Sequence, residues 1–413
     1  MNMKSGFKEI FSCEVCDSNE LTSVLDLGLL PLCDDLVKIK NARSCREFPT
    51  EVLLCPNCKT AHQRYQVDKN LLFTKEYHYR ARFTKDVTSG MSELVASCKE
   101  HCGDISEMSV LDIGCNDGSL LNIFKNEGLK TIGVEPTNAY LDAEKNNHLV
   151  YNAFLTKDFV TKFLKENNRP DIITFTNVFA HIDDLKSLIQ NVKRLAHKET
   201  CIIIENHYLG SILDHAQFDT FYHEHPRSYS FASFQYIAKS LGMQLKRVNF
   251  PNRYGGNIRV FIDNKIDNVT NLPNLDDIYF NEEKFYNKFE KLNQDLQNWR
   301  DRKKVIINDL VKIHGKIAAK AFPGRASILI RFLELDEMSI SAVYEKNGSK
   351  KIGHYVPGTR IPILSDNELF KNNGSEPLLN LAWHIPNEIR EYLHENGIFR
   401  EVIDIISDSD LTT

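Results

Sequence analysis

The sequence predicts an α/β protein of three domains, and three features of the chain support this prediction. Short apolar runs typical of buried strands alternate with amphipathic helical segments through the middle and the end of the chain. A glycine-containing turn follows one such run within residues 110–121. Two Cys-x-x-Cys pairs near the start indicate a small metal-binding lobe. We therefore expect domains at residues 1–75, 76–270 and 271–413, with Rossmann-like sheets in the second and third.

The composition fits an ordinary globular protein. The 413 residues are 42% apolar and 26% charged, and the net charge of -5 gives no electrostatic basis for binding nucleic acid. No apolar run approaches the roughly eighteen residues of a membrane span, and the first residues lack the apolar core of a signal peptide. We expect a cytoplasmic protein that binds neither nucleic acid nor membrane. Three coupled domains in one chain are compatible with a monomer.

Four of the ten cysteines are spaced as metal ligands. Cys13 with Cys16, and Cys55 with Cys58, form two knuckles that can each place two thiolates on one tetrahedral ion. We expect a structural Zn²⁺ held by four thiolates. A redox pair is the alternative, but neither knuckle opens a helix in a thioredoxin-like unit. The segment between the knuckles, which includes residues 27–32, is expected to form a small lobe of its own.

The turn within residues 110–121 indicates a nucleoside site at the start of the second domain. Gly114 and Gly118 allow a sharp turn and a close approach of a ligand to the backbone. Asn116 replaces a middle glycine, and asparagine tolerates the left-handed conformation well. The next strand ends in Glu135, about twenty residues downstream, where an acid can accept hydrogen bonds from both hydroxyls of a ribose.

An acid ahead of the turn indicates which nucleoside is bound. A dinucleotide site shows G-x-G-x-x-G, with a helix N-terminus that faces a pyrophosphate. Here the order is D-x-G-x-N-x-G, and Asp112 is the leading acid. This carboxylate repels phosphates and suits a cationic ligand without phosphate, which favours S-adenosylmethionine (SAM) over NAD.

The remaining elements follow in α/β order. In the second domain we expect helices at residues 139–147 and 185–197, and strands at 149–152, 171–176, 200–205 and 258–262. A long amphipathic helix from 282 to about 311 leads into the third domain. There we expect strands at 315–322, 340–344 and 378–383, and helices at 326–335 and 387–395.

Polar residues that follow two of these strands are candidates for the reaction. Asn177 and His181 come after the strand at 171–176, and the carboxyl end of such a strand faces the ligand crevice. Residues 222–225, Tyr-His-Glu-His, are the densest cluster of titratable groups in the chain. A metal is disfavoured there because no distant third ligand is evident. Histidine oriented by glutamate suits acid and base catalysis near neutral pH.

Taken together, these motifs resemble the nucleotide-sugar C-methyltransferase family, enzymes that place a branching methyl group on C3 of deoxy-keto-sugars. The resemblance spans nearly the whole chain and implies a class I methyltransferase sheet in the second domain. The matching motifs are the two zinc knuckles, D-I-G-C-N-D-G at 112–118, G-V-E-P at 133–136, N-V-F-A-H-I at 177–182, Y-H-E-H at 222–225, G-G-x-x-R at 255–259, Y-V-P-G at 355–358, and Trp383 with Glu388 and Ile389.

The resemblance also implies a substrate and residue roles. The substrate would be a nucleoside-diphosphate 4-keto-sugar, whose α-proton is removed to give an enolate that is methylated by SAM. His225 would be the base, and Tyr222 and Glu224 would orient it or hold the enolate oxygen. His181, Tyr77 and Tyr79 would line the sugar pocket. Cofactor-binding residues are expected to be Asp112, Gly114, Cys115, Asn116, Gly118, Glu135, Pro136 and Asn177. Substrate-binding residues are expected to be Asn257, Arg259, Arg325 and Tyr355.

Three segments depart from the family pattern. Arg80-Ala-Arg-Phe83 stands where small serines are usual, and residues 205–208 read Glu-Asn-His-Tyr instead of Glu-Val-Pro-Tyr. The turn at 321–326 has fewer glycines and an added arginine, Arg325, which is suited to pair bidentately with a diphosphate. Arg80 and Arg82 either meet an acidic or phosphorylated substrate or are solvated surface charges.

Two other functions stay open on the sequence. In the first, SAM is the cofactor, but its methyl group goes to an oxygen or nitrogen of a sugar or small metabolite. This stays open because a cluster of His, Tyr and Glu can remove a proton from oxygen or nitrogen as well as from carbon. The second is a zinc-stabilised, non-catalytic binding protein with a degenerate cofactor site. Tyr77 and Tyr79 also have a plain alternative, because alternating aromatic residues often pack along a strand.

Overall fold

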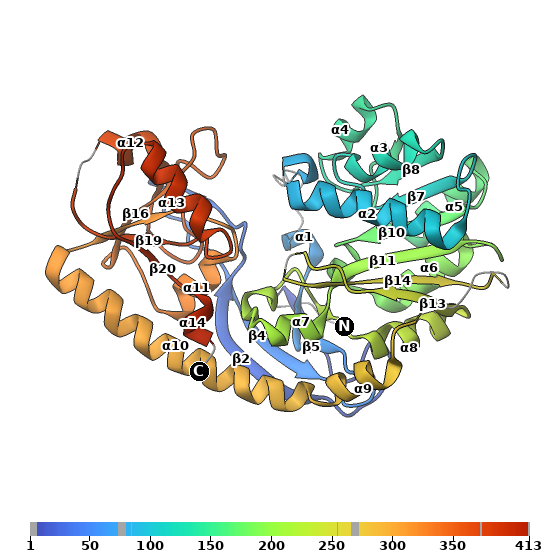
Figure 1. The fold of residues 1–413 in the computed structure, drawn as a ribbon, viewed down its shortest axis with the longest axis horizontal. Coiled ribbons are helices and arrows are strands. Elements are labelled where there is room, and N and C mark those ends of the chain that lie inside the picture. Colours follow the sequence, from blue (N-terminus) through green and yellow to red (C-terminus); the bar gives the residue numbers. More distant parts are fainter. Residues whose placement is uncertain are drawn as a thin grey trace. The chain divides into compact units, whose positions relative to one another are not determined.

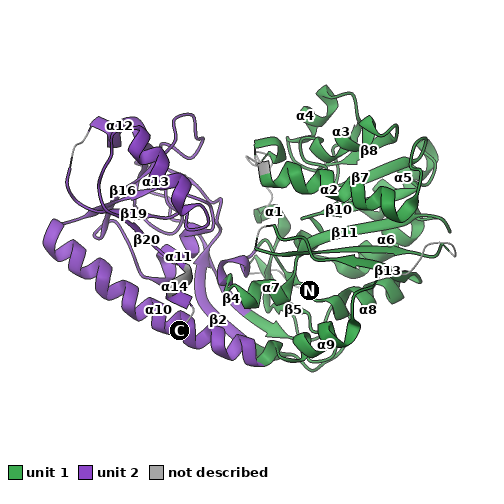
Figure 2. Ribbon diagram, viewed as in Figure 1, with its two compact units in different colours: residues 1–23, 52–217, 224–286 green, residues 24–51, 218–223, 287–413 purple. Residues whose placement is uncertain are grey.

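The protein forms two compact units in the computed structural model (Figure 2). The structure describes residues 6–72, 80–83, 85–253, 255–265, 272–371 and 374–411. The first unit comprises residues 1–23, 52–217 and 224–286, and the second comprises residues 24–51, 218–223 and 287–413. The segment between the knuckles was expected to form its own lobe, but residues 24–51 belong to the second unit. The expected limits of the three domains stay a prediction.

The first unit is built on a seven-stranded sheet with the order β13-β14-β11-β10-β7-β8-β9 (Figure 1). All neighbouring pairs from β11 to β9 are parallel, and β14 runs antiparallel to both of its neighbours. The strands are β7 (Ser109–Ile113), β8 (Lys130–Val134), β9 (Leu149–Tyr151), β10 (Ile172–Thr176), β11 (Cys201–His207), β13 (Gln244–Asn249) and β14 (Asn257–Asp263). The chain begins this sheet at the interior strand β7, continues outward through β8 to β9, and then returns to β10 on the other side of β7. Ligands bind at such a switch point in open α/β sheets.

Helices cover both faces of this sheet because its strands are apolar on both sides. Within β11, Ile202 and Ile204 lie in one buried cluster, whereas Cys201 and Ile203 lie in the other. The helices of this unit are α1 (Lys69–Leu72), α2 (Lys85–Cys102), α3 (Ser119–Asn126), α4 (Tyr140–Lys145), α5 (Lys157–Glu166), α6 (Leu185–Leu195), α7 (Leu209–Asp214), α8 (Phe231–Leu241) and α9 (Leu275–Glu283), with 3-10 turns η1 (Ala81–Phe83) and η2 (Phe179–His181).

Further strands pair outside the seven-stranded sheet. Strand β1 (Phe7–Glu9) pairs with β6 (Tyr65–Val67), and β3 (Val37–Lys38) pairs with β17 (His354–Tyr355). A four-stranded sheet has the order β12-β5-β4-β2. Its strands are β12 (Arg227–Ser228), β5 (Ala61–Gln63), β4 (Glu47–Leu54) and β2 (Thr22–Pro31).

The second unit contains a five-stranded parallel sheet with the order β18-β16-β15-β19-β20. Its strands are β15 (Ile317–Lys320), β16 (Ile340–Glu345), β18 (Ile363–Ser365), β19 (Leu378–Asn380) and β20 (Val402–Asp404). Its helices are α10 (Phe285–His314), α11 (Ala326–Phe332), α12 (Asp366–Lys371), α13 (Pro386–Glu395) and α14 (Asp408–Leu411), with a 3-10 turn η3 (Phe218–Thr220). On α10, the fully buried Trp299 stacks on Phe332, with the two ring centroids 6.0 Å apart.

The helix expected from residue 282 begins earlier and is two helices. Helix α9 ends at Glu283, and α10 begins at Phe285. The carboxylate of Glu282, at the end of α9, accepts hydrogen bonds from the backbone N–H groups of Phe231 and Ala232 at 2.6 and 3.1 Å. These bonds fix α9 to the start of α8, so the chain bends before α10. The other expected elements are present within a few residues of the expected limits.

Candidate active site

The turn between β7 and α3 has the backbone that the sequence predicts. Gly114, Asn116 and Gly118 have φ angles of 73°, 49° and 77°. A side chain on Gly114 would place its Cβ 2.4 Å from a methyl carbon of Val178, so the turn and the end of β10 require glycine there. Helix α3 begins at Ser119, as expected, and its N-terminus follows this left-handed turn.

Two buried acids stand beside the turn. The Asp112 carboxylate accepts a hydrogen bond of 2.7 Å from the Thr174 hydroxyl. The Glu135 carboxylate accepts bonds from the backbone N–H of Asn116 at 3.0 Å and from the N–H and hydroxyl of Thr137 at 2.8 and 2.6 Å. Burial raises the pKa of Asp112 to about 7, and burial also raises the pKa of Glu135. A cationic nucleoside ligand would favour the charged form of both acids, so they fit SAM.

Cys115 and Pro136, which were also expected to bind the cofactor, have surroundings that differ from those of the two acids. Cys115 is buried, and a Cβ on Gly133 would lie 2.5 Å from its sulfur, so its side chain packs into the core and only its backbone faces the turn. Pro136 follows Glu135 and is half-buried.

The turn is held from one side by the segment that precedes α2. The Asn116 side-chain oxygen accepts a bond from the backbone N–H of Ala81 at 3.1 Å, and Asp117 accepts one from the N–H of Arg82 at 3.0 Å. Arg80 donates to Asp142 at 2.8 Å, and Arg82 forms ion pairs with Asp117 and Asp142. These two arginines therefore have partners within the protein. Tyr77 and Tyr79 lie outside the described residues.

Three imidazoles gather where β10 and β11 end. The ring centroids of His181 and His225 are 4.8 Å apart, and those of His207 and His225 are 5.8 Å apart. The Nδ1 atom of His181 lies 2.8 Å from the backbone oxygen of Glu224. Burial lowers the pKa of His181, which keeps this ring neutral at physiological pH. Asn177 has a φ of 53°, and its backbone N–H donates to the backbone oxygen of Glu205 at 2.8 Å.

The Tyr-His-Glu-His motif divides between the two units. Tyr222 and His223 belong to the second unit, and Glu224 and His225 belong to the first. His223 is buried, its Nε2 lies 3.0 Å from the Thr50 hydroxyl, and burial lowers its pKa to about 4. It is therefore a neutral core residue. Glu224 and His225 are both buried, and Tyr222 is half-buried.

The expected substrate residues of the first unit surround a buried acid. The Glu205 carboxylate accepts bonds from Arg253 at 2.7 Å, Asn257 at 2.9 Å and Arg259 at 2.6 Å. Asn257 and Arg259 are almost fully buried, so this network fixes the strand ends β11 and β14. The buried charges of Glu205, Arg253 and Arg259 are therefore paired with one another.

The expected substrate residues of the second unit have protein partners as well. Arg325 forms an ion pair of 2.9 Å with Asp219, and its Nη1 donates to the Thr220 hydroxyl at 3.1 Å. The Tyr355 hydroxyl accepts a bond from the backbone N–H of Lys40 at 3.2 Å. The roles predicted for these residues in substrate binding stay predictions.

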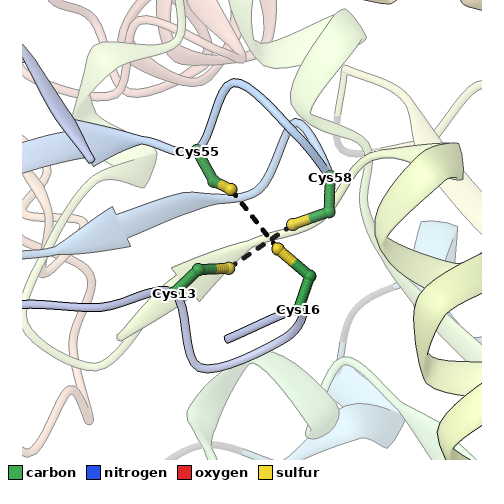
Figure 3. A group of neighbouring side chains, drawn as sticks. All are labelled: Cys13, Cys16, Cys55 and Cys58. Carbon is green, nitrogen blue, oxygen red and sulfur yellow. Dashed lines mark hydrogen bonds between the residues drawn. The ribbon is translucent and has the colours of Figure 1, made fainter. Parts of the chain in front are cut away.

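The four knuckle cysteines come together as predicted (Figure 3). The sulfurs of Cys13 and Cys58 are 3.4 Å apart, those of Cys16 and Cys55 are 3.6 Å apart, and all four lie within 4.8 Å of one another. Zn–S bonds of about 2.3 Å in a tetrahedron place sulfurs about 3.8 Å apart, so the four thiolates fit Zn²⁺.

A second group of possible metal ligands occurs among the described residues, formed by His101, Cys201 and Asp263. The Nε2 atom of His101 lies 2.7 Å from the Asp263 carboxylate, and both side chains are buried. These two groups satisfy each other, so the pair has a structural explanation without a metal.

The sequence did not single out two residues at the strand ends. Asn206 and His207 follow Glu205 on β11, and they were noted only as departures from the family pattern. Their position at the carboxyl end of a strand was the available signal, as it was for Asn177.

A doubly wound sheet, a left-handed turn at its switch point and two buried acids beside the turn define a SAM-dependent methyltransferase. Comparisons with known proteins agree with this class. A family of methyltransferase domains matches residues 79–252, a family of C-methyltransferase C-terminal domains matches residues 252–400, and a family of zinc-binding domains matches residues 13–73. These matches support a SAM-dependent C-methyltransferase with an N-terminal zinc-binding domain.

The chain is 25% identical over 407 residues to the C-methyltransferase NovU of Streptomyces niveus, and the match covers 96% of each protein. A SAM-dependent methyltransferase structure from Archaeoglobus fulgidus has 15% identity and a TM-score of 0.35, with coverage of 42% of this chain and 93% of that one. The magnesium protoporphyrin IX methyltransferase of Synechocystis with bound SAH has 14% identity and a TM-score of 0.35, with coverage of 47% and 91%.

No helix in the described part of the chain is long and apolar enough to cross a membrane.

Proposed function

We propose that the protein methylates the carbon next to the ketone, C3, of a nucleotide-linked 4-keto-sugar through an enolate, with His225 as the base. The observation that supports this most is the group of imidazoles at the ends of β10 and β11. A proton next to a carbonyl needs a positioned base, and the ring of His225 lies close to those of both His181 and His207. A C-methyltransferase family and a C-methyltransferase relative support carbon as the acceptor.

The surroundings of each residue suggest its role in the reaction. Asp112 and Glu135 would hold SAM, which supplies a methyl group activated by a sulfonium. His181 is kept neutral by burial, and its Nδ1 lies beside the Glu224 backbone, so the ring is fixed in orientation next to His225. His225 takes the proton from C3, and the negative charge moves onto the ketone oxygen. A positioned base of this kind contributes roughly 10²- to 10⁴-fold to the rate.

The test is NMR in heavy water with thymidine- and guanosine-diphosphate 4-keto-sugars. We expect deuterium to enter C3 without SAM, and a methyl singlet on a quaternary carbon with SAM. His225→Ala should abolish the exchange and leave SAM affinity, measured by calorimetry, unchanged. The control is His215→Ala, which removes an exposed histidine of the same unit and should change neither.

The proposal fails in three ways. Exchange retained in His225→Ala would remove the assigned base. A methyl group found on oxygen or nitrogen would replace the proposed reaction with the alternative transfer. Wild-type protein that binds SAM but neither exchanges nor methylates any sugar would refute the acceptor class.

A further inference from the structure

Asn206 is a buried polar side chain without a partner. It is 1% exposed, and neither its amide nitrogen nor its amide oxygen has a hydrogen-bond partner in the described structure. Leaving a buried amide unpaired is unfavourable, and the large majority of buried side-chain polar atoms in proteins are paired. A purely structural position would favour an apolar residue, as the isoleucines at positions 202 and 204 of the same strand illustrate.

The place of Asn206 in the sheet connects it with the imidazoles. Thr176 and Glu205 are paired positions of the parallel strands β10 and β11, and Asn177 and Asn206 are the next residue of each. Asn206 is also followed by His207, whose ring lies 5.8 Å from that of His225. The unpaired amide therefore lies at the same strand end as His207, the residue of β11 whose ring is near that of the proposed base.

A second unpaired group comes directly after the neighbouring strand β10. The side-chain oxygen of Asn177 is buried and also has no partner in the described structure. Neighbouring strands are about 4.8 Å apart, a spacing at which two asparagine side chains can reach each other. They nevertheless form no hydrogen bond with each other. Two amides with unpaired atoms at corresponding ends of neighbouring strands can both donate to or accept from one ligand group.

The chemistry of an amide restricts that group. Asn206 presents one acceptor and a donor with two N–H bonds, so a group that both donates and accepts satisfies it best. A hydroxyl does both, whereas a phosphate oxygen without a proton can only accept and would leave the amide oxygen unpaired. We propose that Asn206 binds a ring hydroxyl of the acceptor, so that the enzyme selects a keto-sugar that retains this hydroxyl. This inference rests on the proposed function, because the ligand it names is the sugar.

The experiment compares two buried asparagines of the same unit. Asn206→Leu keeps the approximate size of the side chain and removes its polar atoms. Asn191→Leu is the control, because Asn191 is 4% exposed and its amide donates to the backbone oxygen of Leu155 at 3.0 Å. For both variants we would measure kcat/KM on a keto-sugar and on analogues that lack one ring hydroxyl each, and the melting temperature without ligand.

We expect opposite behaviour from the two variants. Wild-type enzyme should prefer the hydroxylated sugar over one deoxy analogue by at least about 100-fold, and in Asn206→Leu this preference should fall below about tenfold. Asn206→Leu should melt at the same temperature as wild type or about 2–5 °C higher, because an unpaired amide is removed. Asn191→Leu should melt at a lower temperature and keep the wild-type preference.

The inference is overturned if Asn206→Leu keeps the wild-type preference, whether its melting temperature falls, as the control's does, or stays the same. It is also overturned if wild-type enzyme methylates the hydroxylated sugar and every deoxy analogue equally well. If wild-type enzyme uses no sugar at all, the proposed function fails, and the melting temperature alone then decides whether the amide of Asn206 is structural. Should the leucine variant not fold, Asn206→Ala adds no bulk and takes its place.

Discussion

At the scale of single residues, Asp112 is the group through which we expect cofactor binding to depend on pH. Burial raises its pKa to about 7 from the ordinary value of 3.8. Because the folded pKa is the higher one, the folded protein holds the proton more tightly, and this group makes folding less favourable as pH rises from about 4 to about 7. A cationic ligand beside Asp112 favours its charged form and therefore releases the proton.

We therefore predict that SAM binds more weakly as pH falls below about 7. The dissociation constant should rise by up to about tenfold per pH unit, because one proton must leave for each SAM bound. Titration calorimetry between pH 5.5 and 8.5 would measure this dependence. In Asp112→Asn the dependence should be largely lost, and equal slopes in the variant and wild type would assign the proton to another group.

Residue-scale features were predictable where one residue type determines the backbone, and not where a partner comes from a distant segment. Asn116 was expected to be left-handed from its position in the turn alone, and this is confirmed. The ion pair between Arg80 and Asp142 joins residues that are 62 positions apart, so the sequence left open whether the arginine meets a ligand. The unpaired amide of Asn206 likewise depends on which side chains surround β11 in the fold.

At the scale of elements, Arg227 on β12 joins three segments. Its guanidinium bonds the carboxylate of Glu14 in the first knuckle, the backbone oxygen of Ile182 after η2, and the Tyr229 hydroxyl at 3.0 Å. Burial opposes the charge on Glu14, but Arg227 and Lys8 outweigh it and lower the pKa of Glu14 to about 2. The ordinary value is 4.5, and the difference corresponds to about 3 kcal/mol of stability.

Replacing Arg227 by Leu should thus destabilise the protein by at least about 3 kcal/mol at pH 7, because a buried carboxylate loses its partner. The depressed pKa of Glu14 means that its contribution is present above about pH 4.5 and is lost as pH falls toward about 2. Urea unfolding at several pH values should show the two proteins converging in acid. Lys162→Met breaks an exposed pair with Glu166 and should cost less than about 1 kcal/mol; an equal cost in both variants would contradict the argument.

Elements with a clear apolar period were predictable, and elements formed by distant pairing were not. The strands of the central sheet are short apolar runs, and their limits lie within a few residues of those expected. The segment between the knuckles was expected to form a lobe of its own, but its strand β3 pairs with β17, which comes much later in the chain, and residues 24–51 belong to the second unit. The end of α9 depends on bonds from Glu282 to α8, and no local pattern encodes them.

At the scale of the whole molecule, the knuckles belong to the core of the methyltransferase unit. Cys13, Cys55 and Cys58 are buried in the same apolar cluster as one face of the seven-stranded sheet. The backbone oxygen of Cys58 accepts bonds from the hydroxyls of Ser230 and Ser233, at 2.9 and 3.3 Å, where α8 begins. The spacing of the cysteines predicted the metal site, but it carried no information about the helix on which the site is built.

Loss of the metal should therefore destabilise SAM binding as well as the zinc site. Cys55→Ser should reduce the zinc content from about one ion per chain to near zero, because a tetrahedral site with three thiolates binds far more weakly. The melting temperature should fall by at least about 5 °C, and SAM affinity should fall with it, since the core shared with the sheet loosens. Cys45→Ser, which alters a half-buried cysteine outside the cluster, should keep both the zinc and the melting temperature. If Cys55→Ser loses its zinc but keeps wild-type stability and SAM affinity, the site is not part of the folding core of this unit.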